Sequence, residues 1–437
     1  MNIHILAIAG KSTAPLAVEL KNHGHHVTGS DQDKIYPPVS TLLEKNNIPI
    51  NETNISKKIN LVIVGSSYKK FSKTREEYDQ AKLLKIPTIS ATKYINQHIT
   101  KENSIIIAGS YGKTTITGLV SLILINASLD PSYLIGGTVI KSIPSVKINS
   151  SQWSVIEGDE SINGLDDQAK FLYFKTKYVI ITSVGWEHHD SYPTQKDNLN
   201  TYKQLVKNIP SDGLLIYNPF DSKLKKIAKL CKAPTLPYDS NLEFNTPLIG
   251  AHNIQNIKAA YTLCKALNID DSIIKNTIEK YLGISRRLEQ ISVQNNIIFI
   301  DDFAQSSNRI KSSLDAIKTT YPNRPIKLFF EPRASFLLQK KSLKDFGKHL
   351  KDCQQVVIAK IPYKKSIKKS QRSTAKDFSQ QLGNKSVYIP LYDQIVDHYK
   401  HNLSPGDILV HMSSGGQTGQ IALSSIIRHF KNNPKRY

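Results

Sequence analysis

Ser104-Ile-Ile-Ile-Ala-Gly-Ser-Tyr-Gly-Lys-Thr-Thr115 is the segment of this 437-residue chain that most clearly indicates its architecture. Its apolar first half predicts a buried strand over Ser104–Ala108, and the apolar stripe that follows predicts a helix over Lys113–Leu124. Glycines between them let backbone N–H groups approach phosphate oxygens, and the helix N-terminus adds a favourable dipole. The sequence therefore predicts a nucleotide phosphate-binding loop made of Gly109, Ser110, Tyr111, Gly112, Lys113, Thr114 and Thr115.

Two side chains give this loop its expected chemistry. Lys113 can reach the β- and γ-phosphates of ATP, and the Thr114 hydroxyl can ligate Mg²⁺. The loop is two residues shorter than the common G-x-x-x-x-G-K-[ST] pattern, because Ile107 stands where the first glycine would be. The strand–loop–helix context nevertheless favours phosphate binding.

Charged residues follow two further predicted strands, Trp153–Glu157 and Tyr178–Thr182. The segments are Glu157-Gly-Asp-Glu160 and Glu187-His-His-Asp190. In open α/β sheets ligands bind at the carboxyl ends of the strands, so we expect these segments to meet Lys113 at one site. Carboxylates such as Glu157 suit Mg²⁺, and a histidine of the second segment would lie beside the metal.

The first hundred residues have the layout of a mononucleotide-binding half. Strands are predicted over Ile3–Ala9, His26–Thr28 and Leu61–Val64, and Asp31 lies near the distance expected for an acid that binds a ribose. Of the three glycines of G-x-G-x-x-G only Gly10 is present, so an ordinary strand-to-helix turn is an equal alternative.

A third unit begins near Tyr281. Its predicted strands are Ile297–Ile300, Ile326–Phe330, Gln355–Ile358 and Asp407–His411. Strands alternate with helical patterns along the whole chain, so we predict an α/β protein with parallel sheets. No internal repeat is evident.

Composition limits the classes of protein. The net charge is +22, yet the lysines are scattered. We interpret the densest basic run, Tyr363–Arg372, as a solvated loop rather than a nucleic-acid surface. Three distant cysteines fit a reducing cytoplasm, and no apolar run reaches the length of a membrane span. A monomer is favoured, although the sequence leaves the oligomeric state open.

A helix opening with His252-Asn-Ile-Gln-Asn256 carries two asparagines three residues apart. We expect Asn253 and Asn256 to share a face away from the buried stripe of Ile254, Ile257, Tyr261 and Cys264. An amide side chain both donates and accepts, which matches the edge of an adenine, although Asn253 could instead only cap the helix.

Together these motifs resemble the Mur ligase family, the ATP-dependent ligases that build the peptide of bacterial cell-wall precursors. The resemblance rests on the short loop Gly109–Thr115, on Glu157-Gly-Asp-Glu160, on His188 and on His252–Asn256. It implies three domains: a Rossmann-like domain over residues 1–100 that binds a UDP-sugar, an ATP-binding domain over 101–282, and a Rossmann-like domain over 283–437 that brings the amine.

The resemblance also implies roles for single residues. Lys113, Glu157 and His188 would be catalytic, and Thr114, Glu157 and His188 would hold Mg²⁺. The remaining ATP contacts would come from Asn253, Asn256, Arg287 and Asp302. Gly10, Ser30 and Asp31 would bind the UDP-sugar, and Arg333 would bind the peptide.

Within the family the chain resembles the branch that joins UDP-N-acetylmuramate to the tripeptide L-alanyl-γ-D-glutamyl-meso-diaminopimelate. The segments that carry this likeness are Ile35–Thr41, Arg286–Glu289, Asp301–Ala304, Glu331–Arg333 and Asp407–Gly416. Gln305-Ser-Ser307 replaces the usual His-His-Pro, and Glu187 replaces an Asp. Two alternatives stay open: a ligase that adds free L-alanine, and a homologue that binds nucleotide without ligation.

Overall fold

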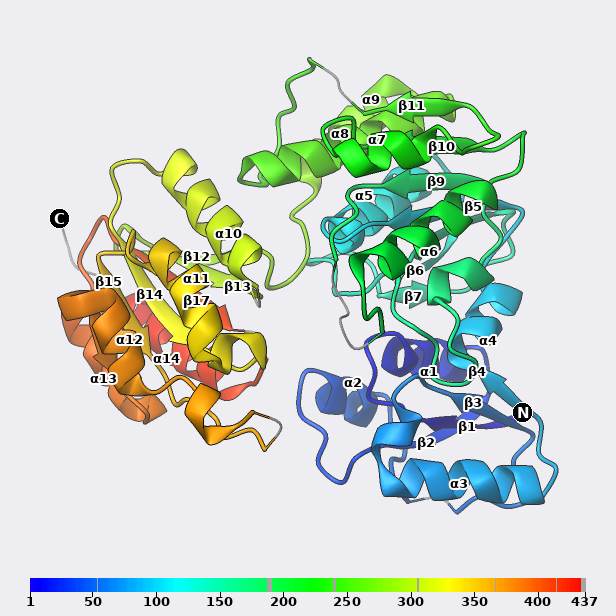
Figure 1. Cartoon of the computed structure of the whole chain (residues 1–437), viewed down its shortest axis with the longest axis horizontal. Coiled ribbons are helices and arrows are strands. Elements are labelled where there is room, and N and C mark those ends of the chain that lie inside the picture. The colour runs from blue at the N-terminus through cyan, green and yellow to red at the C-terminus, as the bar shows by residue number, and fades with distance from the viewer. Residues whose placement is uncertain are drawn as a thin grey trace. The chain divides into compact units, whose positions relative to one another are not determined.

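A computed structural model describes residues 1–52, 54–186, 191–238, 241–304, 306–365, 367–413 and 415–433. The chain is an α/β protein built on three sheets in which parallel pairing dominates (Figure 1). It divides into two compact units, one of Met1–Leu248 with Asn253–Ile284, the other of Ile249–His252 with Ser285–Tyr437. The first unit holds two of the sheets and the second unit holds the third.

The N-terminal sheet has four parallel strands in the order β2-β1-β3-β4. Its strands are β1 (Asn2–Leu6), β2 (His26–Ser30), β3 (Leu61–Val64) and β4 (Thr88–Ser90). Its helices are α1 (Thr13–Asn22), α2 (Val39–Lys45), η1 (Tyr68–Lys70), α3 (Ser72–Leu83) and α4 (Ala91–His98). The first strand is shorter than expected, because Ala7 takes a left-handed φ of 55° and turns the chain.

The central sheet has seven strands in the order β11-β10-β9-β5-β8-β6-β7, and β7 is antiparallel to β6. Its strands are β5 (Asn103–Ala108), β6 (Ser132–Leu134), β7 (Val146–Lys147), β8 (Trp153–Glu157), β9 (Tyr178–Ile181), β10 (Leu214–Tyr217) and β11 (Thr235–Pro237). Its helices are α5 (Lys113–Asn126), η2 (Lys170–Tyr173), α6 (Gln195–Lys207), α7 (Ser222–Ala228), α8 (Ala251–Ala266) and α9 (Asp271–Lys280).

Side chains of β5 alternate between two cores, as a sheet covered on both faces requires. Ile105 and Ile107 pack with residues of α5, α8 and α9, whereas Ile106 and Ala108 pack with residues of α6 and α7. The phosphate-binding loop therefore follows a strand that is fixed on both sides.

The C-terminal sheet has six strands in the order β12-β13-β17-β14-β15-β16. Its strands are β12 (Glu289–Gln294), β13 (Ile297–Asp302), β14 (Ile326–Glu331), β15 (Gln355–Ile358), β16 (Ser386–Tyr388) and β17 (Ile408–Ser413). Its helices are α10 (Ser307–Thr320), η3 (Phe336–Leu338), α11 (Lys340–Leu350), η4 (Lys369–Gln371), α12 (Ala375–Leu382), η5 (Gly383–Lys385), α13 (Tyr392–Asn402) and α14 (Thr418–Asn432).

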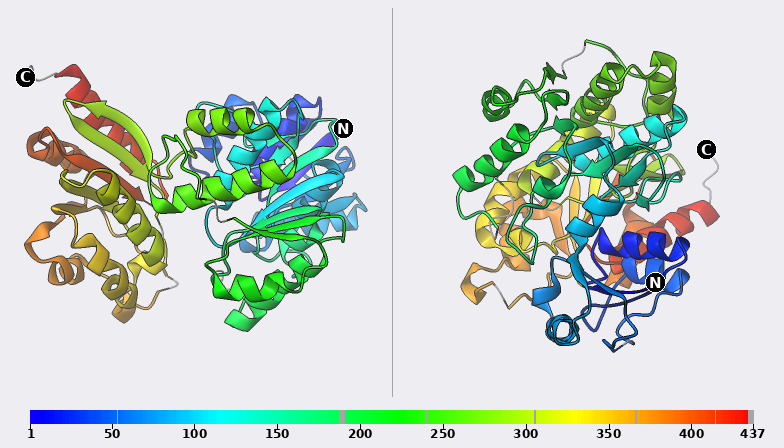
Figure 2. Two further views of the ribbon diagram at one scale, coloured as in Figure 1. Left: turned by 90° about the horizontal axis from the view of Figure 1, so that it is seen from above. Right: turned by 90° about the vertical axis from the view of Figure 1, so that its right-hand side faces the viewer.

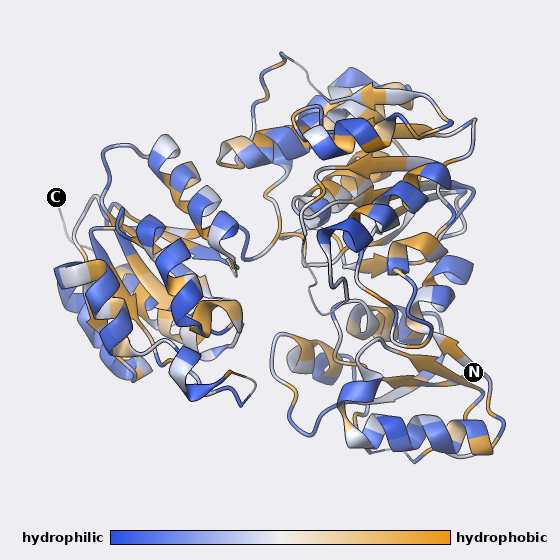
Figure 3. Ribbon diagram, in the orientation of Figure 1, coloured by the Kyte–Doolittle hydropathy of each residue, from blue (hydrophilic) through white to orange (hydrophobic). Residues whose placement is uncertain are grey.

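Helices cover both faces of the C-terminal sheet, and Figure 2 shows this layering from two further sides. One core joins the strands to α10, α11 and α12, and the other joins them to α13 and α14. The strands are mostly hydrophobic, whereas the helices combine hydrophilic and hydrophobic residues (Figure 3). Among the described helices, none has the length and apolar character needed to cross a bilayer.

Candidate active site

Two glycines shape the phosphate-binding loop between β5 and α5. Gly109 has a φ of 120° and Gly112 a φ of 80°, a region that favours glycine. A Cβ at Gly112 would lie 2.1 Å from Oδ1 of Asn256, and one at Gly109 would lie 2.2 Å from Oγ1 of Thr182. Both positions therefore need glycine for backbone conformation and for space.

The loop is tied to the segment that follows β9. The Ser110 N–H donates to the Ser183 carbonyl (3.2 Å), and the Ser110 hydroxyl accepts from the Gly185 N–H (2.7 Å). The Thr182 hydroxyl donates to the Tyr111 carbonyl (2.5 Å). These bonds hold the loop in shape before any ligand binds.

Lys113, the first residue of α5, turns back over the loop. Its Nζ donates to the Gly109 carbonyl (2.5 Å) and to Oε2 of Glu160 (2.8 Å), a carboxylate that is 1% exposed. Burial lowers the pKa of Lys113, but the charge of Glu160 and the hydrogen bond to it outweigh burial and raise the pKa above its ordinary value. The ammonium is therefore charged at neutral pH and aimed across the loop.

The three acids of the segment Glu157-Gly-Asp-Glu160, at the end of β8, each have a different partner. Glu160 pairs with Lys113, and Asp159 pairs with Nζ of Lys170 (2.8 Å). Burial would raise the pKa of Asp159, but Lys170 and the Ser161 N–H hold it well below its ordinary value. Glu157 accepts from the Gly136 N–H (2.8 Å). Sequence reasoning placed this segment at the site but did not identify Glu160 as the partner of Lys113.

Asn253 and Asn256 are buried, at 6% and 8% exposure, whereas Ile254 and Tyr261 are only partly buried. The expectation that the asparagines lie away from the buried stripe is therefore wrong. The reason is the contact with the loop: Asn256 lies against Gly112, and its Nδ2 donates to Oδ1 of Asn253 (3.3 Å). Asn253 and Asn256 therefore lie on the buried face of α8, which also carries the core residues Ile257, Ala260 and Cys264.

In the N-terminal domain, Asp31 binds backbone at the end of β2. Its Oδ2 accepts from the Ala9 N–H (2.8 Å) and its Oδ1 from the Gln32 N–H (2.8 Å). Gly10 lies in the same turn and donates to Thr13 Oγ1 (3.1 Å). Ser30 is fully buried. Asp31 thus shapes the turn that would meet a UDP-sugar, and the ligand roles of Gly10, Ser30 and Asp31 stay predictions.

At the start of the C-terminal domain, Asp302 fixes the backbone beside the arginine pair. Its Oδ1 accepts from the Leu288 N–H (3.0 Å) and its Oδ2 from the Ser313 hydroxyl (2.7 Å). Burial raises its pKa above the ordinary value despite these bonds. Arg287 donates to the Phe303 carbonyl (3.1 Å). The ATP contacts assigned to Arg287 and Asp302 stay predictions.

A buried chain of charges crosses three adjacent strands of the same domain. His411 on β17 is fully buried and lies between Asp301 on β13 (Nδ1 to Oδ1, 2.8 Å) and Glu331 on β14 (Nε2 to Oε2, 3.0 Å). Outer arginines continue the chain: Arg286 pairs with Asp301 (3.1 Å) and Arg333 with Glu331 (3.1 Å). We call these five residues the histidine network; no local sequence pattern indicates that they meet.

Charge balance explains how the histidine network is tolerated. Burial lowers the pKa of His411, but the two carboxylates outweigh burial and raise it, so both ring nitrogens donate. Burial raises the pKa of Glu331, but His411, Tyr392 and Arg333 together bring it down to about 2. Gly419, in the first turn of α14, provides space for the Glu331 carboxylate, because a Cβ at this position would lie 2.1 Å from Oε2 of Glu331.

Comparison with family models decides the identity. The model "Mur ligase family, catalytic domain" matches residues 2–102, "Mur ligase middle domain" matches 107–240, and "Mur ligase, glutamate ligase domain" matches 286–415. The chain belongs to the Mur ligase family. It is therefore an enzyme that uses ATP to form an amide bond.

Curated relatives extend over nearly the whole chain. The UDP-N-acetylmuramate–L-alanine ligase of Desulfitobacterium hafniense is 25% identical over 451 residues, 95% of this chain and 97% of that protein. The ligase of the same name from Acetivibrio thermocellus is 28% identical over 459 residues, covering 95% and 93%.

Solved structures agree in fold. The murein peptide ligase of Psychrobacter arcticus superposes with a TM-score of 0.67 at 23% identity, covering 98% of each chain. The UDP-N-acetylmuramate–alanine ligase of Thermotoga maritima gives a TM-score of 0.79 at 20% identity, covering 99% of this chain and 100% of that one. At these identities the likeness concerns the three-domain fold alone.

Two of the three predicted metal ligands of this Mur ligase, Thr114 and Glu157, lie in the described part of the chain. Thr114 and Glu157 both lie against the pair Gly136-Gly137. A Cβ at Gly136 would lie 2.3 Å from Glu157 Oε1, and a Cβ at Gly137 would lie 3.1 Å from Thr114 Cγ2. His188 lies outside the described residues, as do Glu187, His189 and Asp190. In the described part of the chain, no three His, Cys, Asp or Glu side chains form a metal cluster. A hydroxyl and one carboxylate still suit Mg²⁺, which takes its other ligands from phosphates and water.

Proposed function

We propose that this Mur ligase joins UDP-N-acetylmuramate to the tripeptide L-alanyl-γ-D-glutamyl-meso-diaminopimelate, with cleavage of ATP to ADP and phosphate. One observation favours the tripeptide over free L-alanine as the amine substrate. Arg333 follows the carboxyl end of β14, and its guanidinium is held by Glu331 (3.1 Å) and by the Tyr392 hydroxyl (2.8 Å). A guanidinium fixed in this way suits a substrate carboxylate, and the tripeptide has several that L-alanine lacks.

The chemistry would follow two steps. The lactyl carboxylate of UDP-N-acetylmuramate attacks the γ-phosphorus of ATP, which gives an acyl phosphate and ADP. The alanyl amine of the tripeptide then attacks the acyl carbon, loses a proton and expels phosphate. Lys113 would stabilise negative charge on the transferred phosphoryl group, as a fixed cation does in such transfers.

Lys113 would change partners when ATP binds. In this structure its ammonium lies between Gly109 and Glu160, both within 2.8 Å. The β- and γ-phosphates would replace the Gly109 carbonyl, and Glu160 would keep the ammonium over the loop. Mg²⁺, held by Thr114, Glu157 and His188, would supply further positive charge to the phosphates.

Each domain would have one main ligand, and Arg287 and Asp302 of the third domain would also contact ATP. Residues 1–100 would bind the UDP-sugar, 101–282 ATP with Asn253 and Asn256, and 283–437 the peptide. Because Asn256 packs on Gly112, we assign it a second task, that of holding the loop in its phosphate-binding shape.

A second candidate is the ligation of free L-alanine. It is supported by the curated relatives, which carry that activity in their names at 25–28% identity over most of the chain. Nucleotide binding without ligation is the third candidate, motivated by Gln305-Ser-Ser307 and the reduced N-terminal glycine loop.

A phosphate-release assay separates these functions. The enzyme is given ATP, Mg²⁺ and UDP-N-acetylmuramate with either the tripeptide or L-alanine, and mass spectrometry identifies the product. We expect the tripeptide to support turnover with a much higher kcat/KM. Preference for L-alanine would establish the second candidate, and ATP binding with no amine-dependent phosphate release would establish the third.

A further inference from the structure

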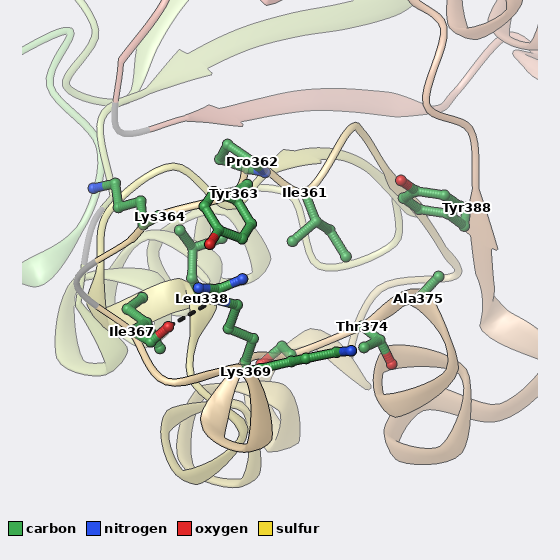
Figure 4. Close-up of a pocket in the computed structure, with 12 residues that line it drawn as sticks. Leu338, Ile361, Pro362, Tyr363, Lys364, Ile367, Lys369, Thr374, Ala375 and Tyr388 are labelled. Atoms are coloured by element: carbon green, nitrogen blue, oxygen red, sulfur yellow. Dashed lines mark hydrogen bonds between the residues drawn. The ribbon is translucent and has the colours of Figure 1, made fainter.

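Five residues of the basic run, Tyr363, Lys364, Ile367, Lys369 and Arg372, line a pocket at the carboxyl edge of the C-terminal sheet, although the sequence favoured a solvated loop. The pocket has a volume of about 350 Å³. Its wall is formed by the segment after β15, by η4 and by the start of α12, with Leu338 and Tyr388 completing it. In Figure 4, Tyr363 and Tyr388 lie on opposite sides of the pocket, and Ile361 and Pro362 stand between them.

Three cations and no acid line this pocket. Lys364, Lys369 and Arg372 are the charged members of the twelve lining residues, and the others are apolar, aromatic or hydroxyl-bearing. The nearby acid Asp377 is already engaged, because it accepts from the Thr374 N–H (2.8 Å) and pairs with Lys340 (3.3 Å). The pocket therefore combines an aliphatic surface with a positive field that no neighbouring carboxylate in the lining offsets.

The cations are held to different degrees. The Arg372 guanidinium stacks on the Tyr363 ring at 3.9 Å from its centroid, and its Nε donates to the Ile367 carbonyl (2.8 Å). Lys364 donates to the Ser335 hydroxyl (3.1 Å). Lys369 has no ion-pair partner within the described residues. Arg372 is thus oriented in advance, and Lys369 is available to a ligand.

The pocket and Arg333 lie along the same edge of the C-terminal sheet. Arg333 follows β14, Ile361 follows β15 and Tyr388 ends β16, and these three strands are parallel neighbours. At about 4.8 Å between adjacent strands, the ends of β14 and β16 lie roughly 10 Å apart along the sheet edge. An extended peptide advances about 3.3 Å per residue, so a tripeptide bound at Arg333 can reach the pocket with its last side chain.

We propose that this pocket binds the side chain of the third residue of the peptide and selects an aliphatic chain that ends in a carboxylate. The inference rests on the proposed tripeptide-adding function. Methylenes would lie against Ile361, Pro362 and Tyr363, and the terminal carboxylate would meet Lys369 and Arg372. Meso-diaminopimelate carries that carboxylate beside its terminal amine. Lysine ends in an ammonium alone and is repelled by the same cations.

The test compares two tripeptides that differ only in the third residue, diaminopimelate or lysine. The wild-type enzyme is expected to prefer diaminopimelate in kcat/KM. Lys369→Ala should reduce the kcat/KM for the diaminopimelate peptide roughly fivefold, the size of one partly screened charge contact, and leave the lysine peptide unchanged or improved. Lys369→Glu should raise use of the lysine peptide further.

Lys368→Ala is the matched control, since Lys368 is the adjacent exposed lysine of the same run but does not line the pocket. Equal effects of Lys368→Ala and Lys369→Ala on the two peptides would overturn the inference, as would a wild-type enzyme that uses both peptides equally well. A wild-type enzyme that uses neither tripeptide but uses L-alanine would overturn the proposed function itself, a result distinct from the other two.

Discussion

Lys113 is the cation through which we expect the loop between β5 and α5 to stabilise charge on ATP. We expect Lys113→Ala to lower kcat/KM by a factor of about 100 or more, since removal of one fixed charge-stabilising group costs a few kcal/mol of barrier. Amine-dependent phosphate release measures the loss, and circular dichroism shows whether the fold is kept. The exposed lysine at the end of α6 gives the control Lys207→Ala, which should behave as wild type. Wild-type turnover by Lys113→Ala would mean that the loop is assigned wrongly.

Glycine at 112 serves the same loop through backbone conformation and space. Gly112→Ala should destabilise the protein by about 1–2 kcal/mol through its left-handed φ and also displace Asn256, whose Oδ1 would lie 2.1 Å from the new Cβ. ATP binding should weaken at least tenfold in calorimetry. Gly24 has the same φ of 80° with no atom within 4 Å of a Cβ, so Gly24→Ala isolates the backbone cost. If both variants bound ATP equally well, the contact with Asn256 would have no part in shaping the loop.

At the scale of the element, strands β13, β17 and β14 are joined by the histidine network, which gives the C-terminal domain a pH-dependent stability. Folding raises the pKa of His411, so its contribution is fully present below the ordinary histidine pKa of about 6.5 and is lost as pH rises through the folded pKa. The pKa of both acids is lowered, so their contribution is present above about pH 4.5. Removal of the charged His411 side chain from between the two acids should lower the free energy of unfolding by on the order of 3 kcal/mol.

Thermal unfolding of wild type and His411→Gln at several pH values checks this. The difference in Tm between the two proteins should be largest near pH 5.5–6.5 and should shrink as pH rises from there through the folded pKa of the histidine. The groups that face His411 are Asp301 and Glu331, with Arg286, Arg333 and Gln420 around them. His401→Gln, an exposed histidine on α13, is the control and should show no such gap. A gap that stays constant from pH 5.5 to pH 9 would mean that His411 is not protonated in the fold.

Elements whose signals are local could be predicted, and contacts between distant residues could not. Leu61–Val64, Trp153–Glu157 and Gln355–Ile358 were expected at their observed bounds, because each is a short apolar run that polar or turn residues end. The antiparallel strand β12 was missed. Its hairpin depends on Asn295 and Asn296, which take φ of 50° and 57°. Asparagine tolerates these angles, but the pair Asn-Asn alone does not identify a hairpin turn.

The site shows the same limit. The loop between β5 and α5 is one continuous motif, so its place between a strand and a helix could be predicted, and its binding of phosphate stays a prediction. The pairing of Lys113 with Glu160 spans 47 residues, and that of His411 with Asp301 spans 110, so neither leaves a pattern in the chain. Asn253 and Asn256 were expected on a face away from the apolar stripe, but they lie on the buried face of α8 that Ile257 and Cys264 share.

At the scale of the whole molecule, the net charge of +22 should assist capture of anionic substrates. Screening shortens the reach of surface charge from about 10 Å at 0.1 M salt to about 3 Å at 1 M. We therefore expect the KM for ATP and for UDP-N-acetylmuramate to rise several-fold over that range while kcat changes less. Initial rates at several NaCl concentrations measure this. A KM that does not depend on salt would show that the basic surface does not contribute to substrate capture.

Under the proposed function, substrate choice also belongs to the whole molecule, because the C-terminal domain would present the amine to the acyl phosphate. Arg333 is the residue through which we expect this choice to be made. Its side chain is 33% exposed, and Glu331 and Tyr392 fix its direction. A site built for several charged contacts rejects a ligand that lacks them, since its polar groups would stay unpaired.

Arg333→Ala should therefore lower kcat/KM for the tripeptide by roughly tenfold or more and change that for L-alanine little, so that the gap between the two amines narrows. Arg333→Lys keeps the charge without the bidentate geometry, so its kcat/KM for the tripeptide should lie between those of the wild type and the alanine variant. Arg428→Ala removes an exposed arginine from α14 and should leave the gap intact. If Arg333→Ala weakened both amines equally, Arg333 would support the fold of the domain, and recognition of the peptide carboxylates would have to come from other residues along the same sheet edge.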